Sequence, residues 1–170
     1  MLTLLSIQDF MSKALRGDTS VPPSVLEEFA EDCRAATADQ LSREKRKWRI
    51  RMSGLGRPVC QQILDKQGVE ETMSYNTLFR FLFGDITEAI VMLIMKEAGV
   101  DIVDYQRPVS LDLDGVTING TLDVIIRDES GVEKVWDIKS ASDYAYKSKF
   151  TGFEGYEGIK KDDPFGYVMQ

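Results

Sequence analysis

The sequence predicts a mixed α/β domain of the α+β type, in which a mainly helical N-terminal part precedes a small, antiparallel-rich mixed sheet with flanking helices. Helical spacing of apolar residues prevails over residues 24–98, and alternating strand patterns separated by turns prevail over residues 109–138. With 170 residues, 43% of them hydrophobic, the chain suits one folded domain. We divide it into a helical segment, residues 1–50, packed on a core formed by residues 51–170.

The first expected helix runs from Ser24 to about Trp48. Ser24 and Glu27 have the spacing of a capping box, and the apolar residues that follow recur at helical intervals. Cys33 lies on this apolar face and is expected to be a packed thiol.

Three further helices are expected before the sheet. One begins at Pro58 and ends at Gly68, and the next is capped by Ser74. The pair Gly84-Asp85 interrupts the pattern, and the last helix covers residues 86–98. This last helix is apolar on every side, so we expect it to be central and buried.

Strand patterns follow, and they predict a meander of three antiparallel strands. The dipeptide Asp114-Gly115 is typical of a tight hairpin turn, and residues 128–131 predict a second turn. The segments with strand character are Val109–Leu113, Val116–Ile118, Leu122–Ile126 and Glu133–Ile138.

The chain contains no histidine, which excludes Ser-His-Asp and Cys-His catalysis and zinc held by histidine. Hard-metal chemistry on carboxylates remains, together with lysine as a base or electrostatic group. The two cysteines, the absence of a basic leader and a longest apolar run of seven residues predict a cytoplasmic protein without membrane association.

Charge is unevenly distributed along this chain of net charge −7. Residues 43–57 carry seven basic side chains and one acidic side chain around Trp48, whereas residues 101–146 carry four basic and ten acidic ones. The basic block is interpreted either as a phosphate-binding surface or as a solvated helix end. Its candidate nucleic-acid-binding residues are Arg43, Lys45, Arg46, Lys47, Arg49, Arg51 and Arg57.

Two aspartates interrupt apolar strand segments. Asp123 lies 14 residues before Asp137, and a hairpin that turns near residues 129–131 would place them side by side. Alternation puts Asp137 and Lys139 on one face and Trp136 and Ile138 on the other. Paired carboxylates on a half-buried strand repel each other. Either one carboxylate keeps a proton, or a divalent cation such as Mg²⁺ or Mn²⁺ binds between the two. Alternatively, the acids lie at a solvated edge and Lys139 pairs with one of them.

This pattern resembles the PD-(D/E)XK nuclease superfamily, and it is nearest to the RecB-like branch that includes phage lambda-type exonucleases. The resemblance covers about residues 49–170, with leucine in place of the proline of the superfamily name. The residues that carry it are Ser53-Gly54-Leu55-Gly56-x-x-x-Cys60, Gly84-x-x-x-Glu88, Gly120-Thr121-Leu122-Asp123, Asp137-Ile138-Lys139 and Gln170.

The resemblance implies a restriction-endonuclease-like core and a DNA nuclease, exonuclease-like and phage or bacterial in character. By this resemblance Asp123, Asp137, Glu88 and the Ile138 carbonyl would hold Mg²⁺ or Mn²⁺, while Lys139 would activate water. Gln170 would begin a further catalytic helix, which the sequence cuts short. Cysteines for an iron–sulfur cluster are absent, so none is expected from this chain alone. Besides DNA, the expected partners are further copies of this chain, in a homo-oligomer, or a recombination or replication protein.

Three alternatives stay open at this point. The chain could be a catalytically idle nucleic-acid-binding or assembly module on the same fold, or an unrelated α/β interaction domain with coincidental acids. Asp85-x-x-Glu88 also has the form of a capping box, which would give Glu88 a purely structural role. Cys60 is expected to be a packed thiol and not a ligand.

Overall fold

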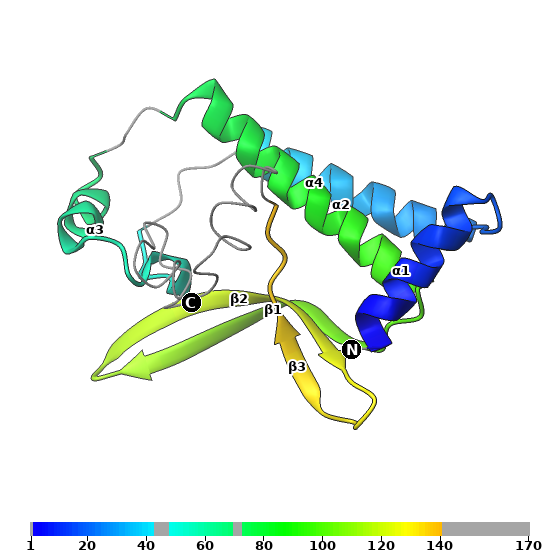
Figure 1. Cartoon of the computed structure of the whole chain (residues 1–170). Coiled ribbons are helices and arrows are strands. Elements are labelled where there is room, and N and C mark those ends of the chain that lie inside the picture. The colour runs from blue at the N-terminus through cyan, green and yellow to red at the C-terminus, as the bar shows by residue number, and fades with distance from the viewer. Residues whose placement is uncertain (1, 43–47, 70–72, 141–170) are drawn as a thin grey trace, which may run out of the picture. The chain divides into compact units, whose positions relative to one another are not determined.

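The computed structural model describes residues 2–42, 48–69 and 73–140 (Figure 1). Helices precede a small antiparallel sheet with the strand order β1-β2-β3, which confirms a mixed fold of the α+β kind. The elements are α1 (Leu2–Leu15), α2 (Pro23–Leu41), the 3₁₀ turn η1 (Met52–Gly54), α3 (Val59–Lys66), α4 (Tyr75–Glu97), β1 (Ile102–Leu113), β2 (Val116–Arg127) and β3 (Glu133–Trp136).

The chain forms two compact units. The described parts of residues 1–44, 73–107 and 122–139 make up the first unit, and those of residues 45–72, 108–121 and 140–170 make up the second. In the first unit both α1 and α2 pack on α4 (Figure 1). The predicted boundary near residue 50 stays a prediction.

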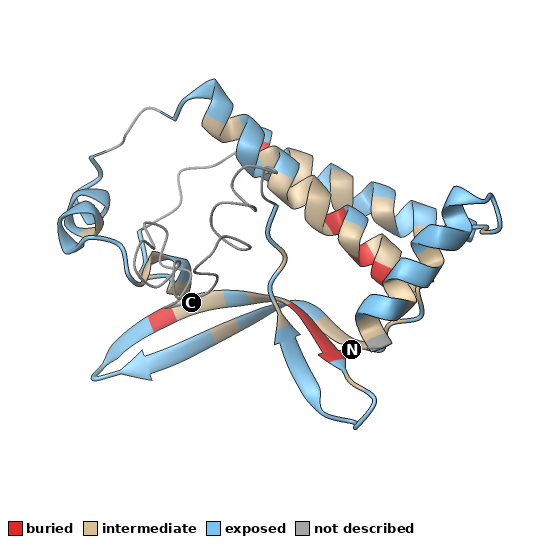
Figure 2. Cartoon of the chain, viewed as in Figure 1, coloured by how far each residue is buried: buried red, intermediate tan, exposed pale blue. Residues whose placement is uncertain are grey.

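The core of the first unit lies between α4 and the hairpin of β2 and β3. Figure 2 shows the buried positions as short stretches of α4 and β2. Side chains of Trp136 and Ile138 pack against this core, which confirms the face predicted for them from alternation. The four most buried members of the cluster are Met92, Met95, Val124 and Ile126.

Helix α4 is continuous, so the predicted break at Gly84-Asp85 is wrong. Ser74 caps the helix as predicted, because its side chain accepts a hydrogen bond from the Thr77 backbone N–H. One glycine in a helix interior costs only about 1 kcal/mol, which is less than the packing of α1 and α2 along a 23-residue helix provides. The helix is also less buried than expected, since Ile90 is 42% exposed.

Helix α2 differs from its prediction at both ends. It begins at Pro23, with Pro22 as N-cap and no side-chain cap hydrogen bond, so the capping box at Ser24 is wrong. Proline at the start of a helix supplies the required φ angle without needing such a cap. The helix ends at Leu41, and Trp48 lies outside any helix. Helix α1 was not among the predicted elements.

The strands are longer than predicted at the β1–β2 hairpin and shorter at β3. Strand β2 merges two predicted segments, while β3 stops at Trp136, just before Asp137. Asp114 and Gly115 have φ angles of 49° and 79°. Two successive positive φ angles are typical of a type I′ hairpin turn, which confirms the turn predicted there.

In the second unit, the segment after residue 48 pairs with the first half of β2. The Asn119 N–H donates to the Ile50 carbonyl over 3.1 Å, and Arg51 forms a parallel bridge with Asn119. A Cβ atom on Gly120 would lie 2.6 Å from Met52 Sδ, so a larger residue does not fit without movement of Met52. Cys60 is exposed, which contradicts the packed thiol predicted there, because the short helix α3 has no buried residue. None of the described helices is long and apolar enough to cross a membrane.

Candidate functional site

The predicted pairing of Asp123 with Asp137 follows from the register of the hairpin. Val124 lies opposite Trp136, and this antiparallel register, continued by one residue, places Asp123 opposite Asp137. The Asp137 carboxylate is near enough to raise the pKa of Asp123. The two acids are therefore neighbours at the open end of the hairpin, as the spacing of 14 residues predicted.

Asp123 is half-buried and receives a hydrogen bond from the backbone that follows β3. The Ile138 N–H donates to Asp123 Oδ2 over 2.8 Å. Burial is the main cause that raises the pKa of Asp123, and Asp137 adds to it, against the opposing effects of the Ile138 N–H and Lys139. The ionised form of Asp123 is thus disfavoured in the metal-free protein.

Lys139 pairs with the second aspartate of the hairpin. Its Nζ lies 2.6 Å from Asp137 Oδ1, and both side chains are exposed. Lys139 also lowers the pKa values of Asp123 and Glu88, so its charge acts on all three acids. The alternative in which lysine pairs with one aspartate at a solvated edge describes Asp137 well, but not the half-buried Asp123.

Glu88 of α4 lies within electrostatic range of Asp123. Burial raises the pKa of Glu88, and the Asp123 carboxylate raises it further. Asp85 lies ten residues inside α4, and its Oδ2 accepts a hydrogen bond of 2.6 Å from the buried Gln40 of α2. A capping box needs its first residue at the helix start, so the capping role considered for Asp85 and Glu88 is wrong.

One neighbour of Glu88 was missed from the sequence. The Gln106 Nε2 of β1 donates to Glu88 Oε1. Gln106 has a φ of 49°, a left-handed value inside a strand. The local sequence predicts neither this hydrogen bond nor the positive φ angle, because glutamine is not a residue type that is typical of such a contact or of left-handed backbone.

The donor set suits a hard divalent cation, because every nearby acidic side chain offers carboxylate oxygen and no histidine or thiol is among them. The raised pKa values of Asp123 and Glu88 result first from burial and then from neighbouring carboxylates, and a bound cation would favour the ionised form of both groups. Within residues 2–42, 48–69 and 73–140, however, no three Asp, Glu, Cys or His side chains are gathered closely enough to hold a metal ion. The acids are neighbours and not a closed ligand set.

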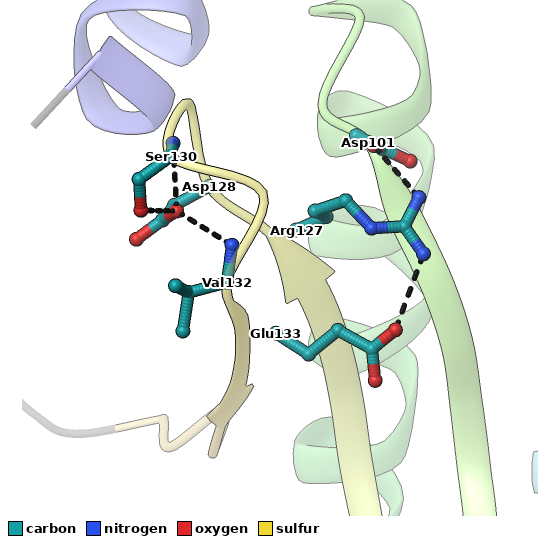
Figure 3. Close-up of polar contacts among 6 residues, drawn as sticks. All are labelled: Asp101, Arg127, Asp128, Ser130, Val132 and Glu133. Carbon is teal, nitrogen blue, oxygen red and sulfur yellow. Dashed lines mark hydrogen bonds and ion pairs between the residues drawn. The ribbon is translucent and has the colours of Figure 1, made fainter.

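The turn between β2 and β3 is organised by Asp128 (Figure 3). Its Oδ1 accepts hydrogen bonds from the backbone N–H groups of Ser130 and Val132, at 2.9 and 3.1 Å, and from the Ser130 hydroxyl. Lys134 lies 2.6 Å from the other oxygen and is the largest cause that lowers the pKa of Asp128. This turn fixes the register on which the approach of Asp123 to Asp137 depends.

Arg127 joins the hairpin to the segment that leaves α4. Its guanidinium contacts Asp101 at 3.3 Å and Glu133 at 3.1 Å (Figure 3). The backbone N–H of Arg127 also donates to the Asp101 carbonyl over 2.8 Å. The strand that carries Asp123 is thereby held beside the end of the helix that carries Glu88.

The remaining predicted residues are placed less completely. Arg49, Arg51 and Arg57 are exposed and lie outside the α-helices, so a helix-end explanation does not apply to these three. They belong to the second unit, whereas the acids belong to the first. Arg43, Lys45, Arg46, Lys47 and Gln170 lie outside the described residues.

Comparisons of the chain with protein-family models, with curated proteins and with solved structures found no match.

Proposed function

We propose that the chain is a metal-dependent DNA nuclease, exonuclease-like in action, that hydrolyses phosphodiester bonds with Mg²⁺ or Mn²⁺ bound to carboxylates. Its core would be of the restriction-endonuclease-like kind that the sequence motifs resemble. The observation that carries the proposal is that Asp123 lies beside Asp137 and within electrostatic range of Glu88, with the Lys139 ammonium acting on all three acids.

This arrangement is costly unless it has a ligand. Like charges at short range, partly removed from water, destabilise the fold that brings them together. A structural cluster could be replaced by neutral polar side chains at lower cost, whereas a cation-binding cluster could not. The cost therefore supports a site that binds a cation.

Each residue has a role that its surroundings support. Asp123, Asp137 and Glu88 would supply carboxylate oxygens to the cation, and the Ile138 carbonyl would lie beside them. A bound divalent cation would lower the pKa of an attacking water and stabilise charge on the phosphate. Lys139 would place its ammonium against the phosphate oxygens, in exchange for its contact with Asp137.

The decisive experiment is digestion of end-labelled linear DNA and closed circular DNA with Mn²⁺. Wild-type protein should degrade the linear substrate, and Asp137→Asn or Lys139→Met should reduce cleavage by at least about 10²-fold. Asp9→Asn and Lys13→Met are matched controls, because they remove an acid and a lysine of an exposed ion pair on α1, outside the acid cluster. Full cleavage by Asp137→Asn would disprove the assignment.

The basic block is the proposed DNA-binding surface. Replacing Arg49, Arg51 and Arg57 by alanine should weaken DNA binding regardless of base sequence. The log–log slope of affinity against salt should flatten by up to about 0.9 for each phosphate of duplex DNA that the variant no longer neutralises. An unchanged slope would show that these arginines do not contact phosphates.

One observation favours a second candidate, a catalytically idle nucleic-acid-binding or assembly module. Lys139 is paired with Asp137, and no three potential ligands are gathered among the described residues. Such a module should bind DNA without metal and show no change in melting temperature with Mn²⁺, whereas a metal site should show a rise.

A further inference from the structure

The second unit has an exposed tryptophan in contact with a lysine. Trp48 is 37% exposed, and Lys66 Nζ lies 5.4 Å from the centroid of its ring. Lys66 belongs to the last turn of α3, 18 residues later in the chain. A tryptophan that keeps more than a third of its surface in water leaves apolar area that a ligand can cover.

Basic side chains accompany this indole in the described segment 48–69. The segment carries four basic side chains and one acidic side chain, a net charge of +3, in a chain of net charge −7. The basic residues, all exposed, are Arg49, Arg51, Arg57 and Lys66, and the acidic residue is Asp65. A local positive charge on an otherwise acidic protein suits a polyanion such as a DNA strand.

Two contacts attach the segment that carries these arginines to α3. Trp48 contacts Lys66 at one end of the helix, and the Gln62 Nε2 donates to the carbonyls of Gly54 and Arg57, in both cases over 3.2 Å. The indole and the backbone of Arg57 are therefore held on the same eight-residue helix. The ring, Lys66 and the segment around Arg57 thus belong to one local structure of the second unit.

The aromatic ring determines which form of DNA suits this surface. Basic side chains alone bind the phosphates of duplexes and of single strands. A base can stack on an indole only when it is not already stacked between its neighbours in a duplex, so an aromatic side chain among cations is typical of surfaces that bind single strands. An exposed cation–π contact stabilises by a factor of about 2–5, whereas stacking of a base on an aromatic side chain contributes about 5–150-fold in affinity. A base can therefore replace the Lys66 ammonium over the Trp48 ring.

An anionic lipid surface is the other class of partner that basic and aromatic side chains together can suit. A helix that lies on a membrane typically has a polar face rich in lysine and arginine. Helix α3 carries one lysine and one aspartate, and the arginines of the segment lie outside it. The distribution of charge therefore favours a DNA strand over a lipid surface.

We propose that Trp48 and Lys66 form a binding subsite for an unpaired nucleotide of single-stranded DNA. The indole stacks on the base, and the Lys66 ammonium leaves the ring to contact a neighbouring phosphate, together with Arg49 and Arg57. The inference rests on the proposed function for the nature of the ligand, and it deepens that function by naming single-stranded DNA as the substrate class.

The test measures the affinity of the full chain for labelled DNA by fluorescence anisotropy, with a chelator in place of metal so that no strand is cleaved. The probes are an oligodeoxythymidylate, a blunt duplex and an abasic strand of the same length, which keeps the phosphates but has no bases. Wild-type protein should bind the oligodeoxythymidylate about 5–150-fold more tightly than the abasic strand. Equal affinities for these two strands would overturn the inference without any variant.

Trp48→Leu keeps an apolar side chain and removes the ring. It should lose the preference for the strand with bases, because removal of the base and removal of the ring eliminate the same contact. Its affinities for the abasic strand and the duplex should stay unchanged, and Trp48→Phe should keep part of the preference. Tyr75→Leu is the matched control, since Tyr75 is an aromatic residue of the first unit that is 87% exposed. An undiminished preference in Trp48→Leu would contradict the stacking role.

Lys66→Met removes the charge and keeps most of the length of the side chain. The log–log slope of affinity for the oligodeoxythymidylate against salt should flatten by up to about 0.7, while the preference for bases persists because the ring is retained. Lys66→Arg should keep the wild-type slope. Lys13→Met, at an exposed ion pair of α1, is the control that should leave the slope unchanged. An unchanged slope in Lys66→Met would overturn the phosphate contact.

The two proposals fail in different ways. Wild-type protein that cleaves DNA with Mn²⁺ but binds the abasic strand and the oligodeoxythymidylate equally would overturn the subsite alone. Base-dependent binding through Trp48 without any cleavage would overturn the nuclease function and support the subsite. Binding to vesicles of phosphatidylcholine and phosphatidylglycerol, without base-dependent binding of DNA, would overturn the inference in favour of a lipid surface.

Discussion

The Asp123 carboxylate and the Ile138 backbone N–H are joined by a hydrogen bond of 2.8 Å, just beyond the paired part of the β2–β3 hairpin. Asp123 therefore has a structural contact besides its proposed role as a ligand. This contact lets the charge of the side chain and its hydrogen-bonding capacity be separated by substitution.

Asp123→Asn removes the charge but keeps an oxygen acceptor for the Ile138 N–H. Asp123→Ala removes both and leaves a partly buried donor unpaired, so it should be less stable than Asp123→Asn by about 1 kcal/mol. Urea unfolding of both variants without metal measures the difference. Equal stabilities would show that the Ile138 N–H finds water in place of Asp123.

The raised pKa values of Asp123 and Glu88 predict how stability depends on pH without metal. Between the ordinary pKa and the raised pKa, the folded state binds more protons than the unfolded chain, so the free energy of unfolding falls as pH rises through this interval. The destabilisation is absent below the ordinary pKa and complete above the raised one. Acids with lowered pKa values elsewhere oppose this trend.

The measurement is therefore a difference between variants. An Asp123→Asn, Glu88→Gln double variant should gain stability over wild type as pH rises from the acidic range to neutrality. Saturating Mn²⁺ should reduce this gain, because a cation stabilises the ionised acids of the wild type. A constant difference across pH would contradict the prediction.

The contacts of Asp128 in the turn should determine how well ordered the β2–β3 hairpin is. Asp128→Ala removes the acceptor of two backbone N–H groups, whereas Asp128→Asn keeps an acceptor and loses the ion pair with Lys134. Amide hydrogen exchange at residues 124–127 should be faster in both variants, and more so in Asp128→Ala. Ser24→Ala, in the first turn of α2 without a cap contact, is a control that should leave these amides unchanged.

The close approach of the Met52 side chain requires glycine at position 120. Gly120→Ala should destabilise the protein by about 1–3 kcal/mol, because the added methyl group would lie 2.6 Å from Met52 Sδ. Combining it with Met52→Ala should recover part of this loss by making room. Thermal melting of the two single variants and the double variant tests the coupling, and strictly additive losses would contradict it.

The sequence predicts the acid pair because a hairpin is a local structure. Residues 123–137 contain their own turn signal, and alternation fixes the faces of Trp136 and Ile138. The approach of Glu88 to Asp123 was expected only from the resemblance, since no local pattern relates a helix position to a strand 35 residues later. Gln106 could not be predicted, because its hydrogen bond reaches a distant helix position and its backbone angle is unusual for glutamine.

Helix α4 shows why a helix-breaking signal in the local sequence can mislead. Gly84 weakens a helix, but it does not end one when residues on both sides have packing partners. The same helix carries Ser74, whose cap contact is local and was predicted correctly. Local hydrogen bonds were thus predictable, whereas the balance between local propensity and long-range packing was not.

The turn organised by Asp128 has a consequence for the order of events during folding. A hairpin that closes around a short turn forms in about 1–10 μs, well before contacts that link distant segments. The two aspartates would therefore be brought together early, before the helix that carries Glu88 docks on the sheet. We expect the nascent hairpin to tolerate their repulsion from the start, with Lys139 as its own counter-charge. Two of the three acids would then belong to one self-contained piece of chain that folds as a kinetic unit.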